Sequence, residues 1–236
     1  MSRKRLPTGI KGLDQVLGGG YPENSLNVIM GSPGAGKSIL AEQLVFAGAS
    51  KERPALYLTT FSEPIEKFIQ NSQAYSFFEP AKIGVEVFYE DLGQPIREKG
   101  YAALTDLIME FVTKQRPRIL VFDSFKALAE LARTPEEGRL VLFDLATLLA
   151  NYDCAAFLVG EYAPDAMTEL PAFAIADSII SLQRHMLAGN DQRFLCVEKL
   201  RGSASAPGLH AFSITSDGIE VFPRLLTPSS EVMEKA

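Results

Sequence analysis

The stretch that decides the fold is Gly31-Ser32-Pro33-Gly34-Ala35-Gly36-Lys37-Ser38, which fills every position of the phosphate-binding pattern G-x-x-x-x-G-K-[ST]. Its glycines allow successive backbone N–H groups to turn inward around a phosphate. Lys37 supplies a cation for the β and γ oxygens, and Ser38 supplies a hydroxyl for Mg²⁺. The loop therefore predicts that the chain binds a nucleoside triphosphate through these eight residues.

The sequence on both sides of the loop agrees with this interpretation. Residues 25–30 form a short apolar run typical of a strand, and residues 39–49 are rich in good helix formers. A phosphate loop of this class connects a strand to a helix, whose N-terminus directs its free amides and positive dipole end at the same anion. The context argues against a chance match.

Length and composition fit one α/β domain of the larger kind. The 236 residues are 47% hydrophobic and 22% charged, which is ordinary for a globular protein with an ample core. We expect one domain over residues 1–226, including the segment 1–24, and a flexible tail at 227–236. No apolar stretch is long enough to span a bilayer, and the basic start at residues 2–5 is not followed by a signal core. The expected location is the cytoplasm.

The distribution of charge argues against nucleic acid as a partner. The formal net charge is −6, and no Lys or Arg stands between Arg139 and Arg184. The acids in that interval are Asp144, Asp153, Glu161, Asp165, Glu169 and Asp177. Because Lys and Arg neutralise phosphates, this half of the chain should repel them. The basic clusters at residues 3–5 and 116–118 keep open the alternative of a protein that works on DNA.

The positions of the cysteines and histidines do not indicate a disulfide, a catalytic thiol or a metal site. Cys154 and Cys196 each lie within an apolar run, where we expect a buried thiol and neither a disulfide nor a nucleophile. His185 and His210 lie far from each other and from any cysteine or acidic cluster at ligand spacing. A zinc site is therefore not expected.

Apolar runs and helical patterns alternate along most of the chain. Strands are predicted at 55–60, 85–89, 119–122 and 155–159, with helices at 65–74, 96–116 and 136–151. This rhythm predicts a parallel sheet with right-handed crossovers. Beyond Ala176, strands at 177–182, 193–199, 211–215 and 219–222 follow one another closely, with turn residues between them. The predicted fold class is α/β, with a mostly parallel central sheet flanked by helices and an antiparallel C-terminal extension.

Two carboxylates are candidates for the chemistry that a triphosphate requires. Asp123 ends an apolar strand, where this fold class places a magnesium carboxylate, and we predict that it holds Mg²⁺ through water. The alternative is a helix cap, because Asp123 and Ser124 precede a helical stretch. Glu63, just past the second strand, is the candidate that orients the attacking water. Its alternative role is an exposed acid at a helix start.

The ordered set of motifs resembles the KaiC-like branch of the RecA superfamily of P-loop NTPases, as a single-domain member. Besides the phosphate loop, the segments that carry the resemblance are Thr8 to Asp14, Leu17 to Pro22, Phe61 to Pro64, Asp123-Ser124, Gly160-Glu161, Lys199 to Gly202 and Ile214 to Pro223. The resemblance covers nearly the whole chain. Members of the branch are ATPases that assemble into rings, usually of six, with nucleotide held between neighbouring subunits.

The resemblance also assigns roles to residues. It implies ATP and Mg²⁺ as cofactors, with Lys37 at the phosphates and Ser38 and Asp123 at the metal. It further implies that Lys199 and Arg201 reach a neighbour's γ-phosphate as cationic fingers. Without the resemblance, Lys199 and Arg201 alternate on one face of a strand, and a solvated face is the more common explanation.

This sequence departs from the branch in two places. The branch has paired glutamates where this chain has Ser62 and Glu63, so we expect Glu63 to substitute or turnover to be slow. The clock protein that names the branch carries a Ser-Thr acceptor pair where this chain has Ala174 and Ile175, so self-phosphorylation is not expected.

The leading hypothesis is a ring-forming, Mg²⁺-dependent ATPase that regulates an unidentified protein partner, with Glu63, Lys37, Lys199 and Arg201 as its catalytic residues. Three alternatives stay open: a RecA-like DNA recombination or repair accessory protein, a nucleotide-gated scaffold with little hydrolysis, and a kinase for another protein.

Overall fold

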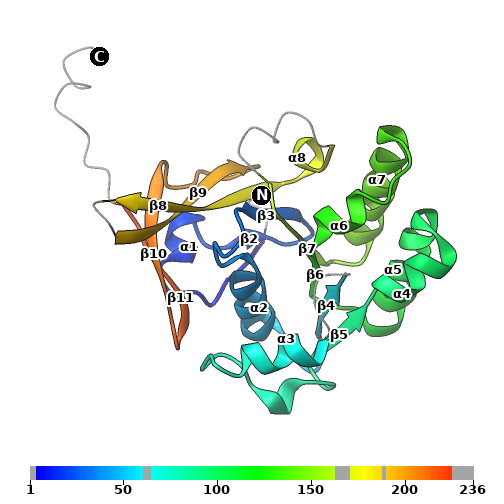
Figure 1. Ribbon diagram of the computed structural model, residues 1–236, viewed down its shortest axis with the longest axis horizontal. Helices are drawn as coiled ribbons and strands as arrows, with labels where there is room; N and C mark the ends of the chain where they lie inside the picture. The colour runs from blue at the N-terminus through cyan, green and yellow to red at the C-terminus, as the bar shows by residue number, and fades with distance from the viewer. Residues whose placement is uncertain (1–3, 61–64, 163–170, 188–189, 225–236) are drawn as a thin grey trace.

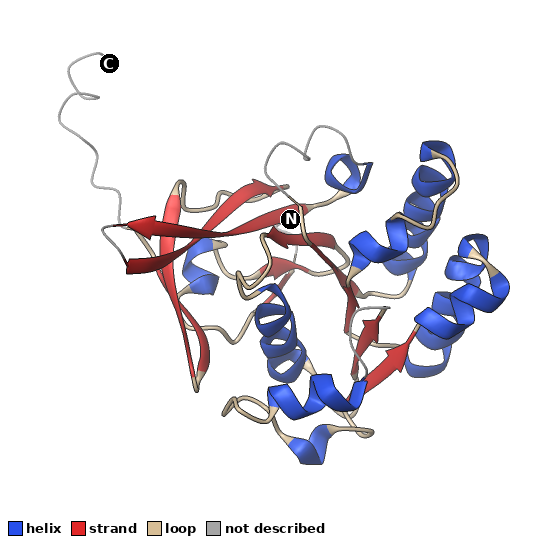
Figure 2. Cartoon of the chain, viewed as in Figure 1, coloured by secondary structure: helices blue, strands red, loops and turns tan. Residues whose placement is uncertain are grey.

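The structure, a computed structural model, describes residues 4–60, 65–162, 171–187 and 190–224 (Figure 1). Its main feature is a nine-stranded sheet with the strand order β11-β10-β9-β8-β3-β7-β6-β4-β5, drawn in red in Figure 2. The strands are β3 (Leu26–Gly31), β4 (Ala55–Thr59), β5 (Val87–Asp91), β6 (Ile119–Asp123), β7 (Ala155–Gly160), β8 (Ser178–Leu187), β9 (Asn190–Leu200), β10 (Leu209–Thr215) and β11 (Gly218–Phe222).

The sheet has a parallel half and an antiparallel half. Strands β8, β3, β7, β6, β4 and β5 are parallel neighbours, whereas β8 to β11 form successive antiparallel pairs. Strand β8 belongs to both halves, because it is parallel to β3 and antiparallel to β9. The predicted α/β fold with an antiparallel C-terminal extension is confirmed.

Two hydrophobic cores lie on opposite faces of the sheet. Successive side chains of a strand point to opposite faces, so Leu120 and Phe122 of β6 join one core, whereas Ile119 and Val121 join the other. Strands β3, β4 and β7 are buried along their whole length, because both of their faces are covered.

The helices divide between the two faces (Figure 1). Helices on the first core are α4 (Gly93–Lys99), α5 (Leu104–Gln115), α6 (Phe125–Ala129), α7 (Pro135–Asn151) and α8 (Pro171–Ile175). Helices on the second are α1 (Leu13–Val16), α2 (Lys37–Gly48) and α3 (Ile65–Ser72). In the part of the chain that the structure describes, no helix combines the length and apolarity needed to cross a membrane.

The predicted continuous helix over residues 96–116 is wrong. Helices α4 and α5 are separate there, with a 3₁₀ turn at Tyr101–Ala103 between them. Gly100 has a φ of 85° and a ψ of 167°, a conformation that is open almost only to glycine and through which a helix cannot continue. Helix α5 does end before Pro117, as predicted.

The N-terminal segment packs against the C-terminal strands. Strands β1 (Arg5–Leu6) and β2 (Tyr21–Pro22) form a small antiparallel sheet, and α1 contributes Leu13 and Val16 to the second core. The backbone N–H of Val221 in β11 donates to the carbonyl of Lys11 at 2.9 Å. The segment before the phosphate loop therefore shares its core with the antiparallel half of the sheet.

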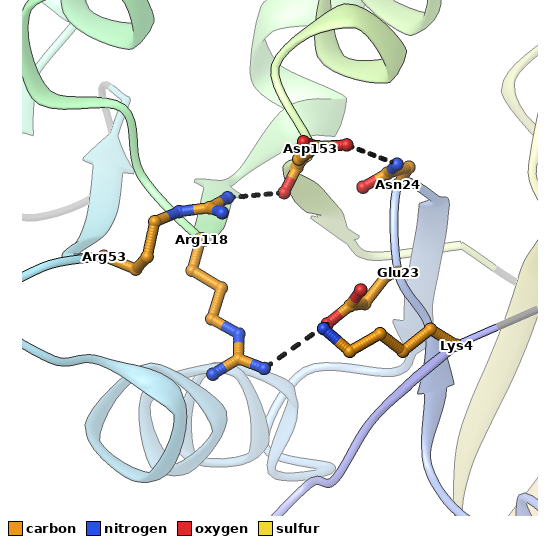
Figure 3. A network of polar contacts seen from close by, with 6 residues as sticks. All are labelled: Lys4, Glu23, Asn24, Arg53, Arg118 and Asp153. Atoms are coloured by element: carbon orange, nitrogen blue, oxygen red, sulfur yellow. Dashed lines mark hydrogen bonds and ion pairs between the residues drawn. The ribbon is translucent and has the colours of Figure 1, made fainter.

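A network of polar contacts joins the N-terminal ends of four neighbouring parallel strands (Figure 3). Arg118, just before β6, lies 3.4 Å from the Glu23 carboxylate, just before β3. Arg53, before β4, donates to the carbonyl of Asp153 at 2.7 Å, and Asn24 donates to the Asp153 carboxylate at 2.7 Å. These contacts hold β3, β4, β6 and β7 together at the edge opposite the one where their carboxyl ends meet.

Replacing Gly12 by alanine should destabilise the protein strongly. Gly12 has a φ of 78°, and a Cβ there would lie 1.9 Å from the carbonyl oxygen of Val221. We expect the free energy of unfolding to fall by at least about 3 kcal/mol, because backbone strain adds to a clash with backbone that cannot yield. Urea unfolding measures this loss.

Gly202 is the matched control for Gly12. Its φ is 70°, and no heavy atom lies within 4 Å of the Cβ position. Gly202→Ala should therefore cost only the backbone term of about 1 to 2 kcal/mol. Equal losses in the two variants would contradict the packing role assigned to the N-terminal segment.

Candidate functional site

The phosphate loop connects the central strand β3 to the N-terminus of α2, as predicted. Gly36 is the N-cap of α2 and has a φ of 104°. A Cβ at Gly36 would lie 2.7 Å from the Ile214 side chain, so glycine is needed there for both conformation and space. The loop therefore stands between the strand and the helix in the arrangement that directs backbone amides at an anion.

Lys37 is a desolvated cation held against the loop. Its side chain is 8% exposed, and its Nζ donates to the carbonyl of Ser32 at 2.9 Å. The Glu161 carboxylate lies 3.9 Å away, at the end of β7. Burial lowers the pKa of Lys37, whereas Glu161 and Asp123 act in the opposite direction. A phosphate group would supply the negative charge that this ammonium lacks.

Asp123 is the last residue of β6. The Tyr57 hydroxyl of β4 donates to its Oδ2 atom at 2.7 Å. Burial and the Asp123 charge raise the pKa of Tyr57 well above its ordinary value, so the hydroxyl remains a donor. Ser124, at the N-cap position of α6, makes no side-chain capping bond. The Asp123 carboxylate therefore has Tyr57 as a partner, and the Ser124 side chain does not cap α6.

These residues line one cleft of about 970 Å³. Gly34, Gly36, Lys37, Ser38 and Asp123 are all in its lining. The remaining walls include residues of α3, α6, β4, β7, β9 and β10. The volume is at the upper end of the range for small-molecule and cofactor sites, which suits a nucleotide.

The other loop residues lie outside this cleft. Gly31, Ser32 and Pro33 line a second cavity of about 480 Å³ on the side of β8, and the Ala35 side chain is wholly buried in the core. Their side chains therefore contribute to the shape and packing of the loop.

Lys199 and Arg201 lie away from the cleft and contact α8. The Lys199 ammonium donates to the carbonyls of Phe173 and Ala174 at 2.9 and 3.0 Å. The Arg201 guanidinium donates to the Ala174 carbonyl at 2.8 Å. Burial and the nearby Arg201 lower the pKa of Lys199. Neither residue lines the cleft of its own chain.

Some predicted residues fall outside the described ranges. Glu63 and Ser62 belong to residues 61–64, and the acidic loop after β7, which contains Glu161, Asp165 and Glu169, is described only as far as Tyr162. The predicted tail at 227–236 also lies outside them.

Sequence reasoning missed two residues of the cleft. Arg193 of β9 donates to the carbonyl of Gly34 at 2.8 Å and so braces the tip of the phosphate loop. Glu42 of α2 is 3% exposed, and the Tyr89 hydroxyl donates to its Oε1 atom at 3.0 Å. Arg193 had no local signal, whereas Glu42 could have been found as a charged residue one helical turn after Ser38 in an apolar run.

Both histidines have hydrogen-bond partners within the fold. His210 is buried and accepts from the backbone N–H of Arg224 at 2.9 Å, and His185 lies beside Gln183 at 3.0 Å. Over the described residues, no group of three or more His, Cys, Asp or Glu side chains is placed to hold a metal ion. A magnesium ion would therefore depend on phosphate oxygens and water besides Ser38 and Asp123.

Glu42 should make stability depend on pH in the nucleotide-free protein. Burial, with a smaller contribution from Asp123, raises its pKa from 4.5 to about 7. Between these values the folded chain binds more protons than the unfolded chain, so the free energy of unfolding falls as pH rises. The free energy of unfolding of Glu42→Gln, relative to that of wild type, should therefore rise by up to about 3 kcal/mol between pH 4.5 and pH 8.

Urea unfolding across this pH range measures the difference. Glu66→Gln, at an exposed acid of α3, is the matched control and should show no such gain. A Glu42→Gln difference that does not change with pH would contradict the role of burial.

Comparisons with known proteins identify the family and agree with the observed fold. A family model described as "ATPase: KaiC" matches residues 6–225. A UPF0273 protein of Methanopyrus kandleri is 30% identical, over 94% of each chain. A UPF0273 protein of Thermotoga maritima is 27% identical, over 93% of this chain and 96% of its own.

The chain is also similar to a longer protein. The circadian clock oscillator protein KaiC of Picosynechococcus is 26% identical over 93% of this chain, which covers 45% of that protein. Because the family model spans most of the chain, and the observed sheet and phosphate loop agree with it, this chain belongs to the KaiC family of ATPases.

Proposed function

We propose that the chain binds Mg·ATP in the cleft and hydrolyses it as one subunit of a ring. The observation that carries the proposal is that Lys37, Ser38 and Asp123 line one cleft of about 970 Å³, with Lys37 and Ser38 in the first turn of α2. Hydroxyl and carboxylate oxygens are the hard donors that Mg²⁺ prefers, and the desolvated Lys37 requires an anion. The residues present thus fit a magnesium triphosphate.

Each residue has a distinct role in this proposal. The loop amides and Lys37 bind the phosphates, Ser38 and Asp123 hold the metal, and Tyr57 orients the Asp123 carboxylate through its hydrogen bond. Mg²⁺ bound with the triphosphate would neutralise charge on the β and γ oxygens. We assign Glu63 to the attacking water, as its orienting residue or base.

The ring is supported by the position of the cationic fingers. Lys199 and Arg201 do not line the cleft of their own chain, so a γ-phosphate contact requires them to reach a neighbouring subunit. The resemblance implies a hexameric ring. In that assembly, Lys199 and Arg201 would give up their hydrogen bonds to the α8 carbonyls and bind the neighbour's γ-phosphate instead. The output would be regulation of a protein partner in the cytoplasm.

The DNA alternative has less support. Arg118 of the basic cluster at 116–118 contacts Glu23 at the edge of the sheet opposite the cleft. Glu161 lies beside Lys37 at the start of the acidic loop. Charge of this sign near the site disfavours a second polyanion there.

Removal of the Lys37 charge should weaken nucleotide binding. We expect Lys37→Ala to lower ATP affinity about 30-fold or more in the presence of Mg²⁺, because a charge-assisted contact is lost in a desolvated site. Titration calorimetry measures it, with Lys51→Ala, an exposed lysine, as the control. No heat from wild type with ATP and excess Mg²⁺ would refute the proposal. Micromolar binding without phosphate release would favour the scaffold alternative.

A mixing experiment tests whether the site is shared between subunits. Glu63→Gln and Arg201→Ala should each abolish most turnover alone. Mixed in equal amounts, they should recover up to about a quarter of wild-type turnover, because an intact site then forms wherever the two variants meet in the right order. Arg139→Ala, at an exposed arginine of α7, should keep wild-type turnover. A mixture no more active than its parts would contradict the shared site.

A further inference from the structure

We propose that Glu42 is a second carboxylate of the magnesium site, a positioning residue that holds the hydration shell of the cation bound by Ser38 and Asp123. The inference rests on the proposed Mg·ATP function. Glu42 is not part of the phosphate-loop pattern, and it is not among the site residues predicted from the sequence.

The helix places Glu42 beside the metal hydroxyl. Ser38 and Glu42 are four residues apart on α2, and side chains at this spacing share one helix face with Cβ atoms about 5 to 6 Å apart. Both residues line the cleft that also contains Asp123. Glu42 is therefore within the reach of water-mediated contact with a cation at Ser38.

Two tyrosines hold the two carboxylates in matching positions. Tyr57 of β4 and Tyr89 of β5 are direct partners in the parallel register, with ring centroids 5.5 Å apart. The Tyr57 hydroxyl donates to Asp123 Oδ2 at 2.7 Å, and the Tyr89 hydroxyl donates to Glu42 Oε1 at 3.0 Å. The tyrosines of two neighbouring strands thus each hold one carboxylate of the cleft, Asp123 at the end of β6 and Glu42 on α2.

The local charge favours a divalent cation. Burial, with a smaller contribution from the Asp123 charge, raises the pKa of Glu42, because no cation in the described part of the chain compensates the carboxylate there. The ion pairs found among the described residues include none with either carboxylate. The titratable groups that face Glu42 are Tyr57, Tyr89 and Asp123, and none of them is a cation. A bound divalent ion would supply the missing positive charge.

A purely structural role does not explain why a carboxyl group is buried at position 42. The neighbours of Glu42 on α2, from Leu40 to Phe46, are buried, and an apolar side chain at this position would avoid the desolvation of a carboxyl group. Buried ionisable groups in clefts are concentrated at functional sites for this reason.

The test measures metal binding directly. The probe is Mn²⁺, titrated into the full chain with a saturating non-hydrolysable ATP analogue and followed by electron paramagnetic resonance of the free ion. Glu42→Gln should weaken Mn²⁺ binding about 10-fold or more, the usual effect of losing an outer-shell partner. Without metal, in EDTA, the same variant should bind the analogue as tightly as wild type or more tightly, because a repelling charge is gone.

A metal role for Glu42 predicts weaker Mn²⁺ binding but unchanged or tighter analogue binding in EDTA. A purely structural role predicts that both affinities fall. Tyr89→Phe removes the brace but keeps the carboxylate and should weaken Mn²⁺ binding about threefold. Glu42→Asp keeps the charge and should recover part of the affinity lost in Glu42→Gln. Glu66→Gln is the control and should change neither affinity.

Unchanged Mn²⁺ affinity in Glu42→Gln would overturn the inference. If that variant does not fold, unchanged Mn²⁺ affinity in both Tyr89→Phe and Glu42→Asp overturns it instead. Failure of the proposed function is separate, because it is seen in the wild type alone as absence of analogue binding with Mn²⁺ in excess.

Discussion

The structure depends on burial of an ammonium group where β3 turns into α2. Lys37 is enclosed because Gly36 allows the chain to turn in a left-handed conformation directly before it, and because α2 is buried on nearly every side. A cation in such a place is stable only beside acceptors, and the carbonyl of Ser32 and the carboxylate of Glu161 meet that need in part. The remaining demand for negative charge defines what the cleft can bind.

The N-terminal and C-terminal ends of the parallel strands differ in function. At one edge, the contacts of Arg53, Arg118 and Asp153 hold the strand beginnings in place (Figure 3). At the other, the strand ends present Asp123 and Glu161, and the tyrosine brace fixes the first of them. Because strands are stiff and share one register, order at the first edge positions the functional groups at the second.

Sequence patterns within short segments predict the strands, the phosphate loop and the residues at strand ends. The apolar runs and the phosphate loop predict the sheet, and the end of a buried strand predicts the place of Asp123. A charge within an apolar run marks the position of Glu42, but its partner Tyr89 is 47 residues away, so sequence does not show what holds its carboxylate. Arg193 has no local signal, and its partner Gly34 is 159 residues away. The break at Gly100 was missed because periodicity does not show whether a glycine continues a helix or ends it. Residues that act through long-range contacts are visible only once the strand order is known.

The charge of the cleft explains why one subunit alone is an incomplete site in the proposed function. The cleft is lined by the acids Glu42, Asp123, Glu130 and Glu161 and by the bases Lys37, Lys126 and Arg193. A triphosphate, which is itself strongly negative, would meet more acids than bases and would require a divalent cation to enter. Charge that develops on the γ-phosphate during transfer requires further cations, and Lys199 and Arg201 are turned toward α8 instead of the cleft. In the proposed function, a second copy of the chain would supply this positive charge.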